Sequence, residues 1–288
     1  MEILLVYKRP RPEELENHDA SFRRVEDVLK LKRIAFETCF REDLSSGKIK
    51  DRLIITVGGD GTLLEASHSV ADNVLMGVNS NPNTSVGSLC VADMNNFSDV
   101  LDDFLSGKLQ PTQVTRMQIE LGGKQLPVLA LNDILIANQN PAAMTRYEVT
   151  ALGQTSFHKN SGLWVCTPCG SSGAVCSTGG RVQPIQDRRL QWVCREPYFA
   201  RMPVPALLAG FLPEGESLRI RSCTSGGRLF IDGPHLQESF EEGTELILSA
   251  SKSILNWLIT PEMENRRQQI GLLRELYEFE RRDESAGV

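Results

Sequence analysis

Apolar and polar positions follow two different patterns along this chain, and the change comes near Pro111. Before that residue, short apolar runs rich in Val, Ile and Leu alternate with segments whose apolar residues recur every three or four positions. The runs predict buried strands, and the segments predict amphipathic helices. Because strands and helices alternate, we expect a doubly wound α/β domain with a mostly parallel sheet over residues 1–111. Its strands are predicted at residues 3–7, 38–40, 53–57 and 74–78, and its helices at residues 21–35, 62–70 and 95–105.

After Pro111 the chain becomes rich in short β-type runs separated by glycine and proline turns, and helical spacing is sparse. This texture predicts a second, β-rich domain of residues 112–260. Its strands are predicted at residues 114–121, 126–137, 147–151, 163–166, 191–194, 218–221, 228–231, 245–249 and 253–259.

The last residues, 261–288, are predicted to form a helix that begins at Pro261. Ile270, Leu273, Leu276 or Tyr277 fall at near-helical spacing among many Arg and Glu residues, and Glu280 continues that spacing. Two interpretations stay open for this helix: it docks on the first domain, or it lies at an oligomer interface.

The composition narrows the class of protein. With 288 residues, 41% hydrophobic and 24% charged, the chain has enough apolar side chains for a packed core. A net charge of −6 argues against nucleic acid as the main partner, because phosphate contacts need clustered Lys and Arg. No apolar run approaches the ~20 residues of a membrane span, and the N-terminus lacks signal-peptide features. Seven irregularly spaced cysteines predict reduced thiols, so we expect a cytoplasmic protein with no membrane partner.

A glycine-rich turn follows the predicted strand at residues 53–57 and precedes a helix. Gly58, Gly59 and Gly61 let a phosphate approach the backbone N–H groups at the helix N-terminus, and Thr62 follows them. Asp60 repels phosphate, which makes sense if it holds a metal or accepts a proton from an attacking hydroxyl. The alternative is a turn in which the aspartate only caps the helix. Asn79 ends the next predicted strand, at the same edge of the sheet.

Two further polar features lie in the second domain. Asn132 and Asp133 interrupt an apolar strand, and burying them is costly unless they are hydrogen-bonded. They predict either recognition of a ribose or amide, or a bulge in which the backbone satisfies both side chains. Residues 160–180 form a strand, a turn of small residues and a short helix, which is typical of a backbone-lined nucleotide cradle.

Other residues allow weaker interpretations. Cys166 and Cys169 form a CxxC pair that fits a redox or zinc site less well than it fits the nucleotide turn. His68 is expected to be a packed or surface histidine, and Lys159 to be solvated surface. The Asp-Gly dipeptide at Asp232 predicts a β-turn.

The sequence Gly-Gly-Asp-Gly-Thr at residues 58–62 resembles the signature of the NAD kinases and of the wider set with diacylglycerol kinases, sphingosine kinases and 6-phosphofructokinases. Residues 131–136 and 160–180 resemble two further NAD kinase motifs, in the same order as in the family. The three motifs together favour the NAD kinases over the other members of the wider set. Asp133 stands where the family has Glu, Ser161 where it has Asp, and Ala174 where it has Tyr. These last two changes, and the run at residues 77–80, are similar to the plant NADH-kinase branch.

The resemblance implies a two-domain NAD kinase architecture and an activity. ATP would donate its γ-phosphoryl to the 2′-hydroxyl of the adenosine ribose of NAD or NADH, with Mg²⁺ or another divalent cation. Asp60 is the implied catalytic base, and a homodimer or homotetramer is implied. The implied phosphate-binding residues are Gly58, Gly59, Gly61 and Thr62. The implied NAD-binding residues are Asp60, Gly61, Asn79, Asn132, Asp133, Ser161, Ser172, Gly173, Ala174 and Ser177. Two alternatives stay open: a kinase of the same fold for a lipid, sugar or nucleoside hydroxyl, and a catalytically silent dinucleotide sensor.

Overall fold

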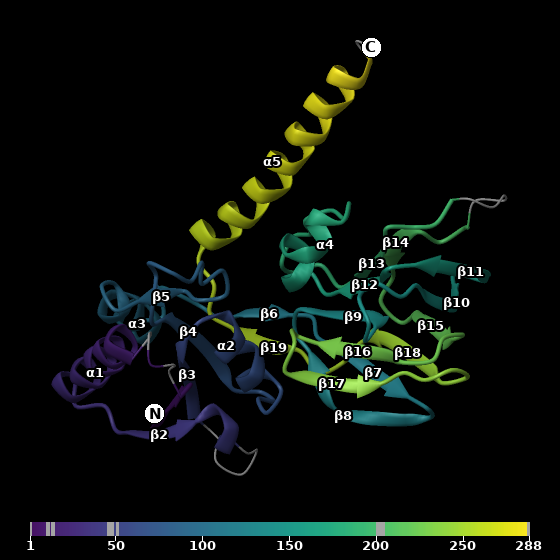
Figure 1. Ribbon diagram of the computed structural model, residues 1–288. Coiled ribbons are helices and arrows are strands. Elements are labelled where there is room, and N and C mark those ends of the chain that lie inside the picture. Colours follow the sequence, from purple (N-terminus) through teal and green to yellow (C-terminus); the bar gives the residue numbers. More distant parts are fainter. Residues whose placement is uncertain are drawn as a thin grey trace. The chain divides into compact units, whose positions relative to one another are not determined.

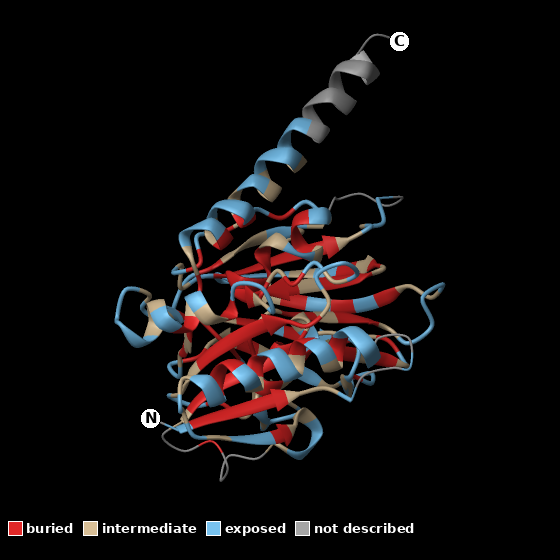
Figure 2. Cartoon of the chain, turned by 90° about the vertical axis from the view of Figure 1, so that its left-hand side faces the viewer, coloured by how far each residue is buried: buried red, intermediate tan, exposed pale blue. Residues whose placement is uncertain are grey.

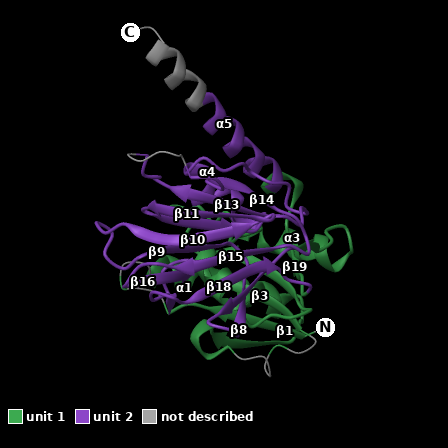
Figure 3. Cartoon of the chain, turned by 90° about the vertical axis from the view of Figure 1, so that its right-hand side faces the viewer, with its two compact units in different colours: residues 1–114, 253–263 green, residues 115–252, 264–288 purple. Residues whose placement is uncertain are grey.

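The computed structural model describes residues 2–9, 12, 15–44, 49, 52–199 and 205–286, and for residues 277–286 it describes the helical backbone alone. The chain divides into two compact units, which Figure 3 colours separately. The first unit is Met1–Val114 with Ser253–Met263, and the second is Thr115–Lys252 with Glu264–Val288. The first boundary lies close to the division predicted after residue 111. The return of residues 253–263 to the first unit differs from the expectation that they continue the β-rich domain.

The first unit is built on a seven-stranded sheet in the order β2-β1-β3-β4-β19-β6, with β5 paired to β4 (Figure 1). Every pair is parallel except β19 with β6, which confirms the predicted mostly parallel α/β fold. Its strands are β1 (Glu2–Tyr7), β2 (Phe36–Phe40), β3 (Arg52–Gly58), β4 (Val74–Asn79), β5 (Ala92–Asp93), β6 (Thr112–Val114) and β19 (Leu255–Trp257). Its helices are α1 (Leu15–Leu31), α2 (Asp60–Ser67) and α3 (Phe97–Leu105), and Arg41–Asp43 form a 3₁₀ turn.

The strand order of this sheet reverses at β1. The chain passes from β1 to β2 on one side and then to β3 on the other. In such sheets, ligands bind outside the carboxyl ends of the strands beside the reversal. Tyr7, Gly58 and Asn79 are the last residues of β1, β3 and β4, so they mark that edge. The apolar runs behind it are buried, as the red strands of Figure 2 show.

The second unit contains two six-stranded antiparallel sheets, in the orders β11-β10-β15-β18-β7-β8 and β14-β13-β12-β9-β16-β17. One cluster of buried side chains joins them, with Tyr147 and Leu248 from the first sheet and Trp192 and Leu229 from the second. The first sheet consists of β7 (Met117–Leu121), β8 (Lys124–Ala130), β10 (Thr145–Ala151), β11 (Gln154–Asn160), β15 (Ser217–Ser222) and β18 (Glu245–Ala250). The second consists of β9 (Asp133–Asn138), β12 (Gly162–Cys166), β13 (Leu190–Arg195), β14 (Ala209–Leu212), β16 (Gly227–Ile231) and β17 (Leu236–Ser239).

Three of these strands, β11, β14 and β17, were not predicted from the sequence. Each lies at the edge of its sheet. An edge strand packs against fewer neighbours, so its sequence needs fewer apolar residues in alternation. β11 has the sequence Gln-Thr-Ser-Phe-His-Lys-Asn, in which one aromatic residue stands among polar ones. Among the interior strands, β10 and β15 alternate buried and more exposed residues, whereas β12 and β13 are buried along almost their whole length.

The C-terminal helix α5 (Pro261–Ala286) begins at Pro261, as predicted. Its leucines are not packed within the part of the chain that the structure describes: Leu272, Leu273 and Leu276 are 60%, 66% and 61% exposed. Beyond Met263, the hydrogen bonds described for this helix join it to other residues of the second unit. No helix in the described part of the chain is long and apolar enough to cross a membrane.

Candidate active site

The glycine turn of the first unit lies between β3 and α2, at the strand ends beside the reversal. Gly59 caps α2, and Asp60 and Gly61 are its first two residues. The first N–H groups of a helix have no acceptor within it, so those of Asp60 and Gly61 lie at the open end. The helix dipole adds partial positive charge there.

The three glycines of this turn differ in how much room a side chain would have at their positions. A Cβ on Gly58 would lie 2.2 Å from Thr62 Oγ1, and one on Gly59 would lie 3.0 Å from Ser85 Oγ. A Cβ on Gly61 would meet nothing within 4 Å. None of the three has a positive φ, so backbone conformation alone does not require glycine at these positions. Packing against Thr62 explains Gly58, a Cβ on Gly59 would need only a small movement of the Ser85 hydroxyl, and the open space at Gly61 suits a ligand.

The Asp60 carboxylate is fixed by two backbone donors. Ser88 N–H donates to Oδ2 at 3.0 Å, and Leu89 N–H donates to Oδ1 at 2.7 Å. Burial raises the pKa of Asp60, and these two hydrogen bonds offset part of that effect. Each carboxylate oxygen keeps a second lone pair. The side chain is therefore held rigidly with a raised proton affinity, which suits a general base.

Asn79 shapes the loop that carries these donors. Its amide donates to Ser85 O at 3.0 Å, and its Oδ1 accepts from Asn81 N–H at 3.1 Å. Gly87 has φ +60° and lies so close that a Cβ would be 2.3 Å from the Asn79 amide nitrogen. Asn79 thus orders the loop as well as lying at the strand edge, a role that was not predicted.

In the second unit, Asn132 and Asp133 lie at the break between β8 and β9. The Asn132 amide donates to Asp133 Oδ2 at 2.7 Å, so the two side chains are joined to each other. Asp232, in the Asp-Gly turn with φ +50°, accepts the N–H groups of Leu131, Asn132 and Asp133 at 2.8, 2.7 and 3.1 Å. Because Asp232 satisfies the backbone, the Asn132 and Asp133 side chains are not used to satisfy it themselves.

Asp133 has an unusual proton affinity. It is 6% exposed, and burial together with the neighbouring charge of Asp232 raises its pKa to about 7. Its carboxyl group therefore titrates near neutral pH. An ionised carboxylate in this place accepts hydrogen bonds from vicinal hydroxyls, whereas the protonated form accepts them more weakly.

The turn after β12 is held against the same break. Thr167 N–H donates to Asn132 O at 3.0 Å, and its hydroxyl donates to Leu131 O. Gly170 passes so close that a Cβ would lie 2.2 Å from Asn132 O, so only glycine fits there. A 3₁₀ turn (Cys169–Ser172) and the short helix α4 (Ala174–Ser177) follow.

The predicted nucleotide-contacting residues of this unit fall in two places. Ser172, Gly173, Ala174 and Ser177 lie in the turn and α4 and are at least partly exposed. Ser161 precedes β12, at the opposite end of that strand from Cys166, which pairs with Asp133. About five residues of strand, roughly 16 Å, separate the two ends, so the structure does not bring Ser161 beside Asn132 and Asp133.

The burial of Cys166 and Cys169 argues against the redox and zinc interpretations of this pair. Cys166 and Cys169 are 0% and 2% exposed, and burial raises the pKa of the Cys166 thiol, which disfavours thiolate chemistry. No group of three or more His, Cys, Asp or Glu residues in the described part of the chain is placed to hold a metal ion. Lys159 Nζ lies 4.5 Å from the centre of the Tyr198 ring in a cation–π contact.

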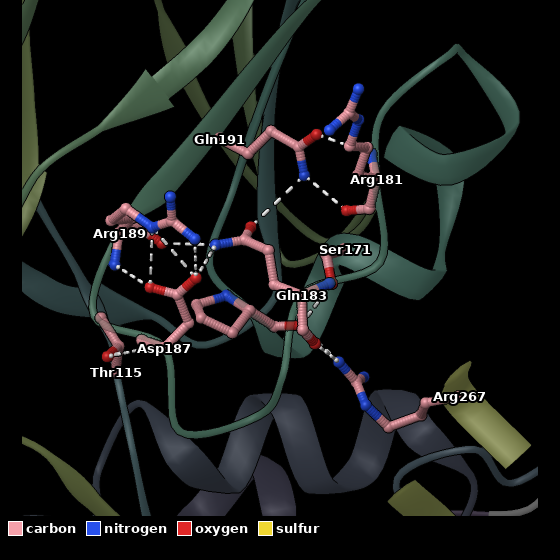
Figure 4. A network of polar contacts seen from close by, with 9 residues as sticks. Thr115, Ser171, Arg181, Gln183, Asp187, Arg189, Gln191 and Arg267 are labelled. Carbon is pink, nitrogen blue, oxygen red and sulfur yellow. Dashed lines mark hydrogen bonds and ion pairs between the residues drawn. The ribbon is translucent and has the colours of Figure 1, made fainter. Parts of the chain in front are cut away.

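Arg267 on α5 is a residue that sequence reasoning missed. Its guanidinium donates to the carbonyls of Pro168 and Cys169 and to Ser172 Oγ, in the turn just described. It belongs to the polar network of Figure 4, which also includes Ser171, Gln183 and Gln191. Nothing in the apolar spacing of α5 signals this arginine, since it is one of many charges in the helix.

Known proteins resemble the chain along most of its length. It is 36% identical over 267 residues to "Probable NADH kinase" of Oryza sativa subsp. japonica, which covers 85% of this chain and 82% of that protein. It is 34% identical over 262 residues to "NADH kinase" of Arabidopsis thaliana, which covers 83% and 82%. No protein-family model matches the chain.

Solved structures share the fold. An NAD kinase from Archaeoglobus fulgidus in complex with ATP superposes with a TM-score of 0.75 at 20% identity, covering 94% of this chain and 99% of that one. Yeast NADH kinase complexed with NADH gives a TM-score of 0.73 at 18% identity, covering 95% and 87%. At these identities the likeness shows the two-domain architecture, and the plant sequences show the relationship.

Proposed function

We propose that this chain, which belongs to the NAD kinase family and to its plant NADH-kinase branch, transfers the γ-phosphoryl group of ATP to the 2′-hydroxyl of the adenosine ribose of NAD or NADH. The products are NADP or NADPH. The observation that carries the proposal is the 36% identity over 85% of the chain. The fixed carboxylate of Asp60 at the strand edge supports it physically. No observation favours a lipid, sugar or nucleoside acceptor, or a silent sensor.

In the proposed reaction Asp60 accepts the proton of the 2′-hydroxyl as the oxygen attacks the γ-phosphorus. The bond from that phosphorus to the β,γ-bridging oxygen breaks, and ADP leaves. The N–H groups of Ser88 and Leu89, which donate to Asp60, keep its carboxylate oriented. This orientation contributes as much to the reaction rate as the basicity of the carboxylate does. Its raised pKa brings its proton affinity closer to the working pH.

The donor phosphates are proposed to lie against the open end of α2. Gly61 offers both an exposed N–H and space, since a Cβ there would meet nothing within 4 Å. Thr62 N–H donates to Gly59 O at 3.0 Å, so its backbone is a weaker candidate donor. Gly58 and Gly59 would act by keeping the turn in this shape.

The acceptor dinucleotide is proposed to use the polar groups of the second unit. The ionised Asp133 carboxylate would accept from ribose hydroxyls, and Asn132 would orient it through the 2.7 Å hydrogen bond. Ser172, Gly173, Ala174 and Ser177 offer small side chains that allow close approach to the backbone. Ser161 and Asn79 are proposed as further contacts with the dinucleotide.

A divalent cation such as Mg²⁺ fits this set of residues only if it arrives with the nucleotide. Mg²⁺ keeps most of its waters and commonly binds one or two carboxylates plus substrate phosphates. The described residues offer no cluster of three ligands, in agreement with that mode. When bound, the cation would neutralise charge on the triphosphate, and we propose Asp60 as the carboxylate that would meet it.

We further propose a cytoplasmic homodimer or homotetramer. The lack of any membrane-spanning helix among the described helices is compatible with that location. Light scattering on the purified protein measures the assembly, and a monomer at micromolar concentration would contradict it.

One experiment tests the proposed activity. The purified protein is incubated with ATP and Mg²⁺ and with either NAD or NADH, and NADP and NADPH are measured separately. Because both plant relatives are named NADH kinases, NADH is the first acceptor to test. A parallel sample with EDTA tests the cation. The proposal predicts phosphorylated product with at least one acceptor, and absence of product with both would overturn it.

A further inference from the structure

The helix α5 contacts the second unit through one line of residues. Glu264, Arg267, Gly271 and Arg274 follow each other at spacings of three, four and three, which places them on one face. The leucines at 272, 273 and 276 lie outside this line and are exposed. The hydrogen bonds described from this face involve Glu264, Arg267 and Arg274, and Ile270 on the same face is half-buried. The face therefore contacts the unit mainly through polar groups, in contrast to the usual amphipathic helix.

Each end of this line contacts the segment of residues 168–185. Ile185 N–H donates to Glu264 Oε1 at 3.2 Å, and an Arg274 guanidinium nitrogen donates to Gly180 O at 2.8 Å. Between them, a Cβ on Gly271 would lie 3.1 Å from a Val182 methyl carbon, so glycine allows the close approach. The contacts extend over three turns of helix.

Arg267 is the central residue of the line and is 3% exposed. Its five N–H donors make five hydrogen bonds within the second unit, one for each donor. The acceptors are Glu264 Oε2 at 3.1 Å, Cys169 O at 2.7 Å, Ser172 Oγ at 3.0 Å, Gln183 O at 3.4 Å and Pro168 O.

Three of these acceptors lie in the turn of residues 168–173. A carbonyl that is held in direction also fixes the plane of its peptide group, and the N–H of the next residue then points the opposite way. Arg267 therefore sets the orientation of the peptides that follow Pro168 and Cys169. Ser171 adds to this, because its hydroxyl donates to Pro168 O and accepts from Gln183 N–H (Figure 4).

We propose that α5, acting through Arg267, holds the turn of residues 168–173 in the shape that binds the dinucleotide. This makes Arg267 a positioning residue, and the inference rests on the proposed function of that turn. Arg267 itself does not need to touch the ligand. Without it, the carbonyls of Pro168 and Cys169 lose their donors, and the turn is free to adopt other shapes before each binding event.

Lysine is a poor substitute at this position. An ammonium group is a compact charge with three donors, whereas the guanidinium is a planar fork with five. Arg267→Lys is expected to keep part of the order of the turn of residues 168–173. Arg267→Met keeps an unbranched side chain without donors and is expected to keep none of the order that Arg267 provides. Arg266→Met is the matched control, because Arg266 is the adjacent arginine on α5 and is exposed.

The test compares these variants in the full chain by two measurements. The first is hydrogen–deuterium exchange of the backbone amides of residues 165–185, which reports the order of the turn without any ligand. The second is the Kd of NADH, followed by its fluorescence, with kcat measured alongside. For Arg267→Met we expect faster exchange in this segment, an NADH Kd raised about tenfold and a kcat changed less than about twofold. Arg267→Lys should fall between Met and wild type, and Arg266→Met should match wild type.

The outcomes separate the inference from the proposed function. Unchanged exchange and unchanged Kd in Arg267→Met overturn the inference, whatever the activity. Equal losses in Arg266→Met also overturn it, since the effect would then be general to the helix. A wild-type protein that binds NADH but forms neither NADP from NAD nor NADPH from NADH overturns the proposed function and leaves the inference on binding standing. If Arg267→Met does not fold, Arg267→Lys carries the same comparison, and its Kd must then exceed that of wild type.

Discussion

The two backbone turns of this protein are held by opposite means. The glycine turn of the first unit continues into α2, whose Leu63 is fully buried and packs against Gly77 of β4. The turn of residues 168–173 in the second unit contacts α5 through hydrogen bonds that Arg267 donates. An apolar contact tolerates small movements, while a hydrogen bond fixes a direction. The comparison teaches that a helix can hold a turn mainly through directed hydrogen bonds instead of apolar packing.

Deleting an apolar side chain from each helix tests this comparison most strongly. Leu63→Ala in α2 is expected to lower the free energy of unfolding by about 2–5 kcal/mol, because it leaves a cavity against the sheet. Leu273→Ala in α5 is the matched change, and it is expected to alter that free energy by less than about 0.5 kcal/mol, since the side chain is 66% exposed. Urea denaturation measures both. Equal losses would show that α5 also depends on apolar packing.

The next largest effect is expected at the start of α2. Asp60→Asn should lower kcat by about a hundredfold or more and leave the NADH Kd nearly unchanged, because a base is lost with little change of volume. Asp93→Asn is a suitable control, since the Asp93 carboxylate also accepts two backbone N–H groups in the same unit. If the control loses as much activity, the effect comes from disturbed loops and Asp60 has no chemical role.

The pH dependence of NADH binding tests the Asp133 carboxylate of the second unit. Asp133 has a pKa of about 7, raised by burial and by Asp232, and the thiol of Cys166 also lies near it. Ionisation strengthens its acceptance of ribose hydroxyls, so the NADH Kd should fall by up to about tenfold as pH rises from about 6 to about 8. Calorimetry at several pH values measures this. Asp133→Asn should bind more weakly at high pH and lose the dependence, and a variant that keeps it would assign the titration elsewhere.

The same pKa has a consequence for stability. Because the folded-state pKa lies above the value of about 4 in the unfolded chain, the folded protein holds this proton more tightly. The free energy of unfolding contributed by Asp133 is therefore fully present below about pH 4 and is lost as pH rises through about 7. Asp133→Asn should flatten this part of the stability profile.

The smallest expected effects come from a pair of helical glycines. Gly61→Ala in α2 meets no neighbouring atom, so we expect stability to be unchanged or raised by up to about 1 kcal/mol while the KM for ATP rises. Gly271→Ala in α5 gains the same propensity but brings a Cβ 3.1 Å from Val182, which should offset the gain. Thermal unfolding and ATP titration measure the pair. An unchanged KM in Gly61→Ala would remove Gly61 from the phosphate site.

The first unit could be predicted well because its strands and its glycine turn show in short stretches of sequence, as apolar runs and as a turn motif. The predicted runs in β1, β3 and β4 are buried except at Tyr7 and Val74, which are half-buried. The Gly-Gly-Asp-Gly sequence correctly predicted a turn at the end of a strand. The hydrogen bonds that hold the polar side chains could not be predicted in the same way. Nothing near Asp60 in sequence shows that Ser88 and Leu89 hold it, since 28 and 29 residues separate them.

The second unit shows the same limit more clearly. Asn132 and Asp133 were recognised because polar residues in an apolar strand are costly, yet Asp232, about a hundred residues later, satisfies their backbone. The prediction of α5 as a helix was correct, but its leucines drew attention to the wrong face. Hydrophobic spacing finds elements that pack by burial, and it says nothing of a helix that docks through arginine and glycine.

The placement of β19 beside β6 bears on how the molecule is made. These two strands are antiparallel neighbours in the first sheet, and all of residues 115–252 are inserted between them. A ribosome releases β1 to β6 early, but the sheet is completed only after the whole insertion has emerged and Trp257 has followed. Until then the start of β4, at Val74 and Leu75, lacks its β19 partner while the inserted residues fold. Chains stalled or cut before residue 255 would expose that edge and be the ones most prone to aggregate.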